Sequence, residues 1–207
     1  LSPFQENNSF QTGYSFLSLD RSLNFLSFTR KFDFYSSKDS SEDRKPVSTA
    51  GISAGIINAG VGSIDGRDGG GLHTKDLSTS ENQFFLSVSN RFSKKLSLGV
   101  AIKFFYYKLY EDISSSGVGL DIGALYKFND YWNVSLVFSD INSKYQWDTR
   151  PVYEQQGLAL TDNFPLLKKI GVSYYNPEIK LLAADEFESS NARSSIIRAG
   201  AEYNIYK

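Results

Sequence analysis

Cysteine is absent from this 207-residue chain, and histidine occurs once, at His73. Without cysteine there is neither a disulfide framework nor a thiolate metal site, and one imidazole supports neither a multi-histidine metal site nor a Ser-His-Asp triad. No apolar run reaches the roughly 18 residues of a membrane-spanning helix. The mean hydropathy is -0.32 and the net charge is -1. These features exclude a helical membrane protein, give no footprint for nucleic acid, and leave no predicted catalytic site, metal or cofactor.

What the sequence does contain is a long alternation of apolar residues with small or polar ones. Residues 96–110 and 116–128 are the clearest runs, and each has about the length, roughly 9–11 residues, with which a tilted strand crosses a bilayer. Strands of soluble proteins are usually shorter, about 5–6 residues. An apolar face outside and a face of Gly, Ser, Lys and Asp inside predicts a transmembrane β-barrel. The apolar positions are Leu96, Leu98, Val100, Ile102, Phe104 and Tyr106, then Val118, Leu120, Ile122, Ala124, Tyr126 and Phe128.

Residues 1–207 are predicted to form a single all-β domain, a transmembrane antiparallel meander β-barrel. Aromatic residues make up 15% of the chain, which suits the girdles at the two membrane interfaces. The chain starts at Leu1 without a charged segment followed by an apolar one, so we expect a mature form or a fragment. About ten strands are expected, at residues 10–19, 22–33, 48–63, 82–92, 96–110, 116–128, 132–141, 167–175, 178–187 and 194–206.

The connections alternate between short and long. Residues 93–95 and 129–131 are predicted to be three-residue loops, in which Asn129 or Asp130 takes the left-handed position. The next tight turn on that side is expected at residues 175–178. These loops pair Phe92 with Leu96 and Phe128 with Trp132, and they gather Tyr126, Phe128, Tyr131 and Trp132 at one interface.

Longer, polar connections are predicted at residues 65–80 and 142–165, at the opposite end of the strands. Short turns at one end and long loops at the other are typical of outer-membrane barrels, in which the short turns are periplasmic. The charged connection at residues 34–46 breaks this pattern, because the alternation of strands puts it at the periplasmic end.

Six segments, taken in order, resemble the outer-membrane barrels of the long-chain fatty-acid transporter superfamily. The likeness is closest to the branch that includes the barrel shuttle subunits of the type IX secretion system, and it covers about residues 50–205. Family members carry an N-terminal plug with an Asn-Pro-Ala segment and further C-terminal strands, so we expect an internal portion of a larger barrel. The segments are IDGRDGGG (64–71), LSLGVAIKF (96–104), GVGLDIGALYKF (117–128), SKYQWDT (143–149), FPLLKKIGVSYY (164–175) and RAGAEY (198–203).

Three charged residues are expected on the lumen face, since they share the small and polar side of their strands. Lys103 and Asp121 would lie opposite each other or one diagonal apart, and Lys127 nearer the periplasm. They form either a salt bridge that satisfies polar groups in a crowded interior or a polar station along a ligand path.

Aromatic and apolar candidates complete the predicted site. Phe105, Tyr107 and Leu125 on the lumen side either pack against a plug or line a path for a hydrophobic ligand. In the connection at 142–165, we expect aromatic residues either to form an extracellular binding lip or to pack over the barrel mouth. These residues are Tyr145, Trp147 and Tyr153.

The acidic and glycine-rich stretch around His73 is interpreted as an extracellular loop. Asp65, Asp68 and Asp76 supply oxygen ligands of the kind that Ca²⁺ prefers, but their spacing matches no defined calcium loop. We expect a non-enzymatic protein in contact with outer-membrane lipid. The resemblance implies passive transport of hydrophobic small molecules; the alternatives are a shuttle or scaffold that meets a secreted-protein partner, and a soluble sandwich or lipocalin-like binder.

Overall fold

Ten of the twelve strands form one antiparallel sheet in sequence order. The computed structural model describes residues 8–35, 46, 48–110 and 112–204. The order in the sheet is β1-β2-β3-β4-β5-β6-β7-β10-β11-β12, and β8 and β9 form a separate hairpin. The strands of the sheet are β1 (Asn8–Leu17), β2 (Arg21–Phe34), β3 (Ser48–Arg67), β4 (His73–Arg91), β5 (Leu96–Tyr110), β6 (Ile113–Lys127), β7 (Trp132–Ile141), β10 (Leu167–Asn176), β11 (Leu181–Ser190) and β12 (Ser195–Tyr203).

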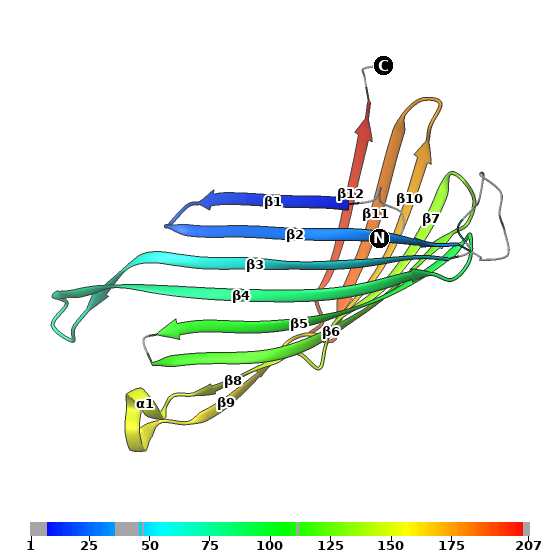
Figure 1. Cartoon of the computed structure of the whole chain (residues 1–207). Helices are drawn as coiled ribbons and strands as arrows, with labels where there is room; N and C mark the ends of the chain where they lie inside the picture. The colour runs from blue at the N-terminus through cyan, green and yellow to red at the C-terminus, as the bar shows by residue number, and fades with distance from the viewer. Residues whose placement is uncertain (1–7, 36–45, 47, 111, 205–207) are drawn as a thin grey trace.

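The predicted all-β meander is confirmed, but the sheet is not closed into a barrel. Strands β1 and β12 are its two edges and do not pair with each other in the described part of the chain. In Figure 1 the strand direction turns from nearly horizontal at β1 to steep at β12. This turning is the twist that antiparallel strands impose on a large sheet.

The long loop predicted at residues 65–80 is wrong, because β3 and β4 continue through most of it. Asp65 pairs with Asp76, and only residues 68–72 connect the strands. A bulge at Ser63, with φ of +46°, lets the ladder resume after its interruption. The turn is held by Asp68, whose carboxylate accepts hydrogen bonds from the backbone N–H groups of Gly70 and Leu72, both at 2.9 Å. The loop was predicted because these residues are polar, but their backbones pair as the end of the β3–β4 hairpin.

The two three-residue loops occur in the predicted register. Arg91 pairs with Ser97, so Phe92 and Leu96 are next in line, and the Phe128 N–H donates to the Trp132 carbonyl at 3.0 Å. The predicted left-handed residue is wrong, since neither Asn129 nor Asp130 has a positive φ.

The Asn129 side chain stabilises its loop by another route. Its carboxamide oxygen accepts hydrogen bonds from the backbone N–H groups of Tyr131 and Trp132. The third tight turn lies at residues 177–180 instead of 175–178, because β10 continues to Asn176, and Lys180 takes the left-handed φ of +50°.

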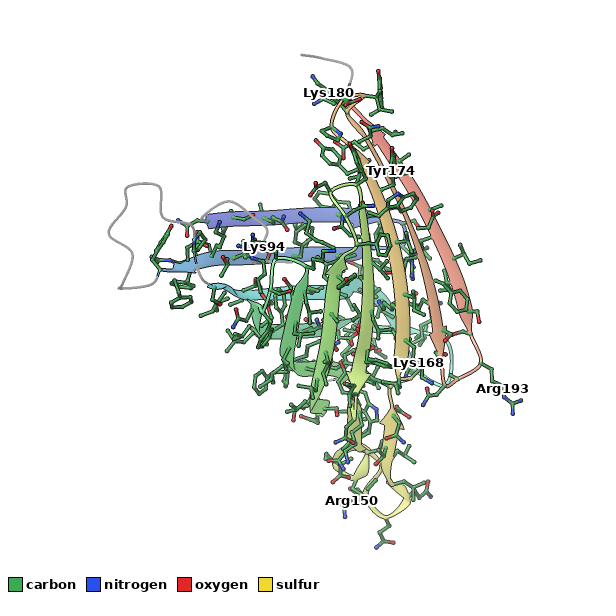
Figure 2. The ribbon with its side chains drawn as sticks, turned by 90° about the vertical axis from the view of Figure 1, so that its right-hand side faces the viewer. Lys94, Arg150, Lys168, Tyr174, Lys180 and Arg193 are labelled. Atoms are coloured by element: carbon green, nitrogen blue, oxygen red, sulfur yellow. The ribbon has the colours of Figure 1, made fainter. Side chains whose placement is uncertain are left out.

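The meander defines two ends of the sheet. The turn end carries residues 93–95, 128–131 and 177–180, and the loop end carries 68–72 and 142–166, on opposite sides as predicted. Figure 2 shows Lys94 and Lys180 toward one end, and Lys168, Arg193 and Arg150 toward the other. The connection at 34–46 starts and finishes at the turn end, where Phe34 pairs with Ser48. Residues 36–45 within it lie outside the described residues.

Side chains of opposite character cover the two faces of the sheet. On one face Val100, Phe104 and Val118 are 47%, 50% and 55% exposed. On the other, Lys103 and Phe105 are buried. We call them the apolar face and the polar face. Neighbouring strands keep this division in register, as in the row Phe28, Ala54, Leu86, Ile102 and Leu120 on the apolar face.

The exposed apolar face forms a band with polar or aromatic borders. Toward the loop end, an asparagine ladder crosses three strands: Asn24 Nδ2 donates to Asn58 Oδ1 at 3.3 Å, and Asn58 Nδ2 to Asn82 Oδ1 at 2.8 Å. Toward the turn end, Trp132 packs on Tyr174 with ring centroids 4.9 Å apart. Along β5, from Leu96 to Tyr106, the band is about 33 Å long at about 3.3 Å per residue. A tilt of about 40° reduces this to about 25 Å, the height of the apolar band of outer-membrane barrels.

Cysteines placed at Val100 and at Ala101 should report opposite surroundings, because successive side chains of a strand point to opposite faces. Val100 lies on the apolar face, whereas Ala101 pairs with Asp121 on the polar face. In lipid vesicles, a membrane-confined quencher should reduce the fluorescence of a label on Val100→Cys and spare one on Ala101→Cys. The cysteine-free chain adds no background label. The reverse pattern would mean that the register of β5 is off by one residue.

Candidate functional site on the polar face

A buried lysine between two aspartates is the centre of the polar face. Lys103 pairs with Gly119 and Asp121 pairs with Ala101, so the two charged residues lie one diagonal apart on β5 and β6. Lys103 Nζ lies 2.8 Å from Asp121 Oδ1 and 2.5 Å from Asp140 Oδ1. Because its side chain is only 8% exposed, the ammonium has lost most of its water, and the two carboxylates offset that cost.

Asp140 reaches this site through an irregularity near the end of β7. Its φ of +62° departs from regular strand geometry within β7, and the pairing of β6 with β7 shifts register between Leu120 and Ile122. The Asp140 N–H donates to Asp121 Oδ1 at 2.9 Å. Regular alternation would place Asp140 on the apolar face, because its neighbour Ser139 lies on the polar face. The bulge instead turns the Asp140 carboxylate toward Lys103 on the polar face.

The chain then crosses the polar face as a strap, residues 142–148, which includes β8 (Lys144–Asp148). Asn142 has a φ of +56°, which redirects the backbone after β7. Gly117 and Gly119 on β6 permit the close approach, because a Cβ at Gly117 would overlap the carbonyl oxygen of Lys144. Ser115 Oγ accepts a hydrogen bond from Gln146 N and donates one to Gln146 O, both at 2.8 Å.

Beyond the strap, the chain forms a projecting hairpin. Strand β8 pairs with β9 (Ala159–Asn163), and α1 (Arg150–Tyr153) and the 3-10 turn η2 (Glu154–Gln156) form the tip. Both views place this tip beyond the loop end of the sheet (Figures 1 and 2). Two side-chain contacts from the Arg150 guanidinium lower the pKa of Asp148 to about 2. The loop predicted at 142–165 is therefore an ordered hairpin.

An aromatic cluster fills the space between the strap and the sheet. Phe105 and Tyr107 of β5 meet Tyr145 and Trp147 of β8 and Phe164, which follows β9. The Phe105 ring centroid lies 5.0 Å from that of Phe164, and the Tyr107 centroid 5.3 Å from that of Trp147, both pairs edge to face. This is the favoured geometry of aromatic pairs. Phe105, Tyr145 and Trp147 are at most 8% exposed.

Two polar atoms of the cluster have hydrogen-bond partners. Tyr145 donates its hydroxyl to Glu81 Oε1 at 2.6 Å, and Trp147 Nε1 donates to Asp162 Oδ2 at 2.7 Å. Burial, together with the neighbouring Glu81 carboxylate, raises the pKa of the Tyr145 hydroxyl, so this group stays protonated as a donor. The cluster offers apolar ring surface and no chemically reactive group.

The structure thus brings together residues that the sequence assigned to different places. Phe105 and Tyr107, expected to face the lumen, contact Tyr145 and Trp147, expected at the extracellular lip. Through these contacts the connection at 142–165 packs against the polar face of the sheet. The side chain of Tyr153, the third residue expected at the lip, lies outside the described part of the structure.

Leu125 and Lys127 lie apart from the aromatic cluster, nearer the turn end. Leu125 pairs with Ser97 and Lys127 with Asn133 on the polar face. Leu125 borders a groove of about 500 Å³. Small side chains dominate its walls, and Asp121 and Glu186 supply the charge; the small residues are Ser53, Ser87, Ser89, Ser97, Gly99, Ala101, Gly123, Ser135 and Ser173.

A second ionic group, near the β12 edge, was missed by the sequence. Glu188 Oε2 lies 3.1 Å from Lys169 Nζ and 3.2 Å from Arg198 Nη1, and Arg198 Nη1 also lies 2.8 Å from Glu186 Oε1. These residues come from β10, β11 and β12 and share the polar face. The sequence shows these charged residues alternating with their neighbours along each strand. It does not show which of them face one another across β10, β11 and β12.

The acidic stretch on β3 and β4 binds its own chain. Asp65 Oδ1 lies 2.7 Å from His73 Nδ1, Asp65 Oδ2 lies 2.6 Å from the Arg67 guanidinium, and Asp68 holds its turn. Within the described ranges, no group of three or more His, Cys, Asp or Glu residues is arranged to hold a metal ion. The geometry gives no support to a calcium site formed by Asp65, Asp68 and Asp76.

No protein-family model, curated protein or solved structure matches this chain. The resemblance to the fatty-acid transporter superfamily therefore stays a prediction. No helix among the described residues is long and apolar enough to cross a membrane.

Alanine at Gly117 should loosen the strap, and alanine at Gly123 should not. A Cβ at Gly117 meets the Lys144 backbone, whereas at Gly123 the nearest atom is Val137 Cγ2 at 3.6 Å. We expect Gly117→Ala to lower the free energy of unfolding by about 1–3 kcal/mol through overpacking. Both glycines lie on the polar face of β6, so the pair is matched. Denaturant titration followed by near-ultraviolet circular dichroism measures the difference; equal effects would contradict the close approach.

Proposed function

We propose that this chain forms the wall of an outer-membrane β-barrel. The observation that carries the proposal is the apolar face, on which large side chains such as Phe84, Val100 and Phe104 are about half exposed. Soluble proteins rarely expose contiguous apolar patches larger than a few hundred Å². At the tilt of about 40° usual for strands of outer-membrane barrels, the band would be about 25 Å high, which suits a bilayer core, and Trp132 and Tyr174 border it at the turn end. Membrane lipid is then the partner of this face.

Closure of the sheet is part of the proposal. In a bilayer every backbone N–H and C=O group must have a partner, so open edges do not occur in the hydrocarbon region. The free edges of β1 and β12 would therefore pair with each other or with further strands. The polar face becomes the interior, where Lys103 and Asp121 are shielded from lipid.

Passive transport of hydrophobic small molecules is the activity that we propose for this barrel. The support is the aromatic cluster around Phe105 and Tyr107, which gives the otherwise polar interior one patch of apolar ring surface. We call the surface of Phe105 and Tyr107 the apolar station. The groove nearer the turn end, with serine and glycine walls and Asp121 at its border, leaves room for a solute to continue in that direction. No covalent chemistry is needed for such a passage.

A non-transporting shuttle or scaffold is the second candidate function. The projecting hairpin favours it, because Leu158 and Leu160 are 63% and 51% exposed there, beyond the apolar band. Exposed leucines on an ordered hairpin offer apolar area that a secreted-protein partner would bury on binding. In this role the aromatic cluster only anchors the hairpin to the wall.

The membrane assignment predicts that the protein needs detergent to remain in solution. The apolar face has nothing to cover it in water, whereas a closed barrel in detergent buries every strand edge. An unboiled sample should migrate differently from a boiled one on a denaturing gel, because the folded barrel resists the detergent. A monodisperse, monomeric protein in detergent-free buffer would refute the membrane assignment.

Uptake into vesicles separates the two candidate functions. The vesicles should carry lipopolysaccharide in the outer leaflet, which apolar molecules cross slowly, and a fluorescent long-chain fatty acid serves as the probe. We expect faster uptake than in protein-free vesicles, and no gain for a charged dye of similar size. Uptake equal to that of protein-free vesicles would exclude transport. A scaffold would instead lose its partner when Leu158 and Leu160 are both changed to Ser.

A further inference from the structure

The apolar station of the polar face is covered by the chain itself. Tyr145, Trp147 and Phe164 pack on Phe105 and Tyr107, and Phe105 is only 4% exposed. The covering rings therefore occupy the surface that an apolar solute would contact. They belong to the strap and its hairpin, not to the ten-stranded sheet.

The strap is attached in a way that permits it to leave without breaking the sheet. Strand β8 pairs only with β9 among the described strands. Within the part of the chain that the structure describes, the polar contacts of the strap with the sheet are two that involve side chains, Ser115 with Gln146 and Tyr145 with Glu81, and one backbone hydrogen bond from the Ser143 N–H to the Asp140 carbonyl at 3.2 Å. Lifting it costs these contacts and the aromatic packing, while the ladders of β5, β6 and β7 stay intact.

An ion pair fixes the point from which the strap departs. Lys103 Nζ on β5 holds the Asp140 carboxylate at 2.5 Å, two residues before the strap begins. Asp140 and Asn142 both have left-handed φ values, so the backbone changes direction at this point. Asp121 binds Lys103 with one carboxylate oxygen and accepts the Asp140 N–H with the same atom. Three strands thus meet at one latch.

We propose that the strap is a lid over the apolar station, and that Lys103 between Asp121 and Asp140 is its latch. The inference rests on the proposed transport function, because a lid matters only where a solute passes. With the latch closed, the rings of the lid occupy the station. Release of Asp140 from Lys103 frees the departure point of the strap, and an apolar solute then replaces the rings on Phe105 and Tyr107.

Trp147 reports the position of the lid. The chain has two tryptophans, so a Trp132→Phe background leaves Trp147, which is 8% exposed, as the sole indole. In detergent, acrylamide should quench this fluorescence weakly. Lys103→Met removes the latch at similar volume and should raise the accessibility of Trp147 at least tenfold, which corresponds to about 1.4 kcal/mol in the opening equilibrium.

Two further variants separate opening from general damage. Lys169→Met removes a lysine of the same face that contacts Glu188 and not the strap, so Trp147 should stay protected. Asp140→Asn removes only one side of the latch, and asparagine tolerates the left-handed φ of this position. If Lys103→Met fails to fold, the result for Asp140→Asn decides. Protection of Trp147 in Asp140→Asn, equal to that in the parent, would overturn the latch.

A reversible disulfide tests whether the lid lies on the solute path. A Cβ at Gly119 would lie 3.2 Å from Ser143 Cβ, slightly closer than the usual span of about 3.5–4.5 Å in a disulfide. The same Cβ lies 3.0 Å from Phe105 Cε2, so the reduced form of the double variant is the reference, and oxidation of Gly119→Cys with Ser143→Cys should lock the lid. We expect fatty-acid uptake to stop in the oxidised form and return after reduction. Equal uptake in both forms would overturn the lid. Exposure of Trp147 in Lys103→Met and Asp140→Asn without uptake in any variant would support the latch and refute transport.

Discussion

One constraint governs the whole sheet: side chains alternate between its faces, so a slip of one residue would exchange apolar and polar surfaces on the affected strand. The ladders maintain that register across ten strands. Rows of large apolar residues therefore lie beside one another on one face, and Ser, Gly and charged residues lie beside one another on the opposite face. The proposed contact with lipid, the ionic groups and the aromatic cluster all depend on this division.

The site forms where the alternation of side chains between the two faces is interrupted in β7. At Asp140 the bulge moves one carboxylate from the apolar to the polar face, where it completes the environment of Lys103. The same change of direction starts the strap, and the glycines of β6 allow the strap to lie against the sheet. Bulges are frequent beside functional sites because they redirect a side chain without dismantling the ladder. Here one bulge both neutralises a buried cation and supplies a covering segment.

The sequence predicts regular parts of this protein well, because alternation is a local property. Strands such as β5 were predicted with the observed bounds, and Lys103 and Asp121 were expected either opposite each other or one diagonal apart, of which the structure has the diagonal. The involvement of Asp140 was not predicted, since it depends on a backbone angle and on a strand two positions away. The aromatic contacts of Trp147 were equally hidden, because nothing local shows where a long connection folds back. Residues 65–67 and 73–80 were predicted as part of a loop because most of them are polar, although they belong to β3 and β4; backbone pairing does not require apolar side chains.

The charges of the polar face are arranged so that most of them neutralise one another within a few ångströms. Lys169 and Arg198 face Glu186 and Glu188, whereas Lys103 faces two carboxylates and leaves one negative charge in excess. A buried pair contributes little net stability because desolvation offsets the attraction, but loss of one partner is costly. Moving Asp140 away leaves a neutral Lys103–Asp121 pair and returns a carboxylate to water, so the electrostatic cost of opening is smaller than the short distances suggest. The aromatic packing then supplies most of the resistance, and an apolar solute that replaces those ring contacts would offset it.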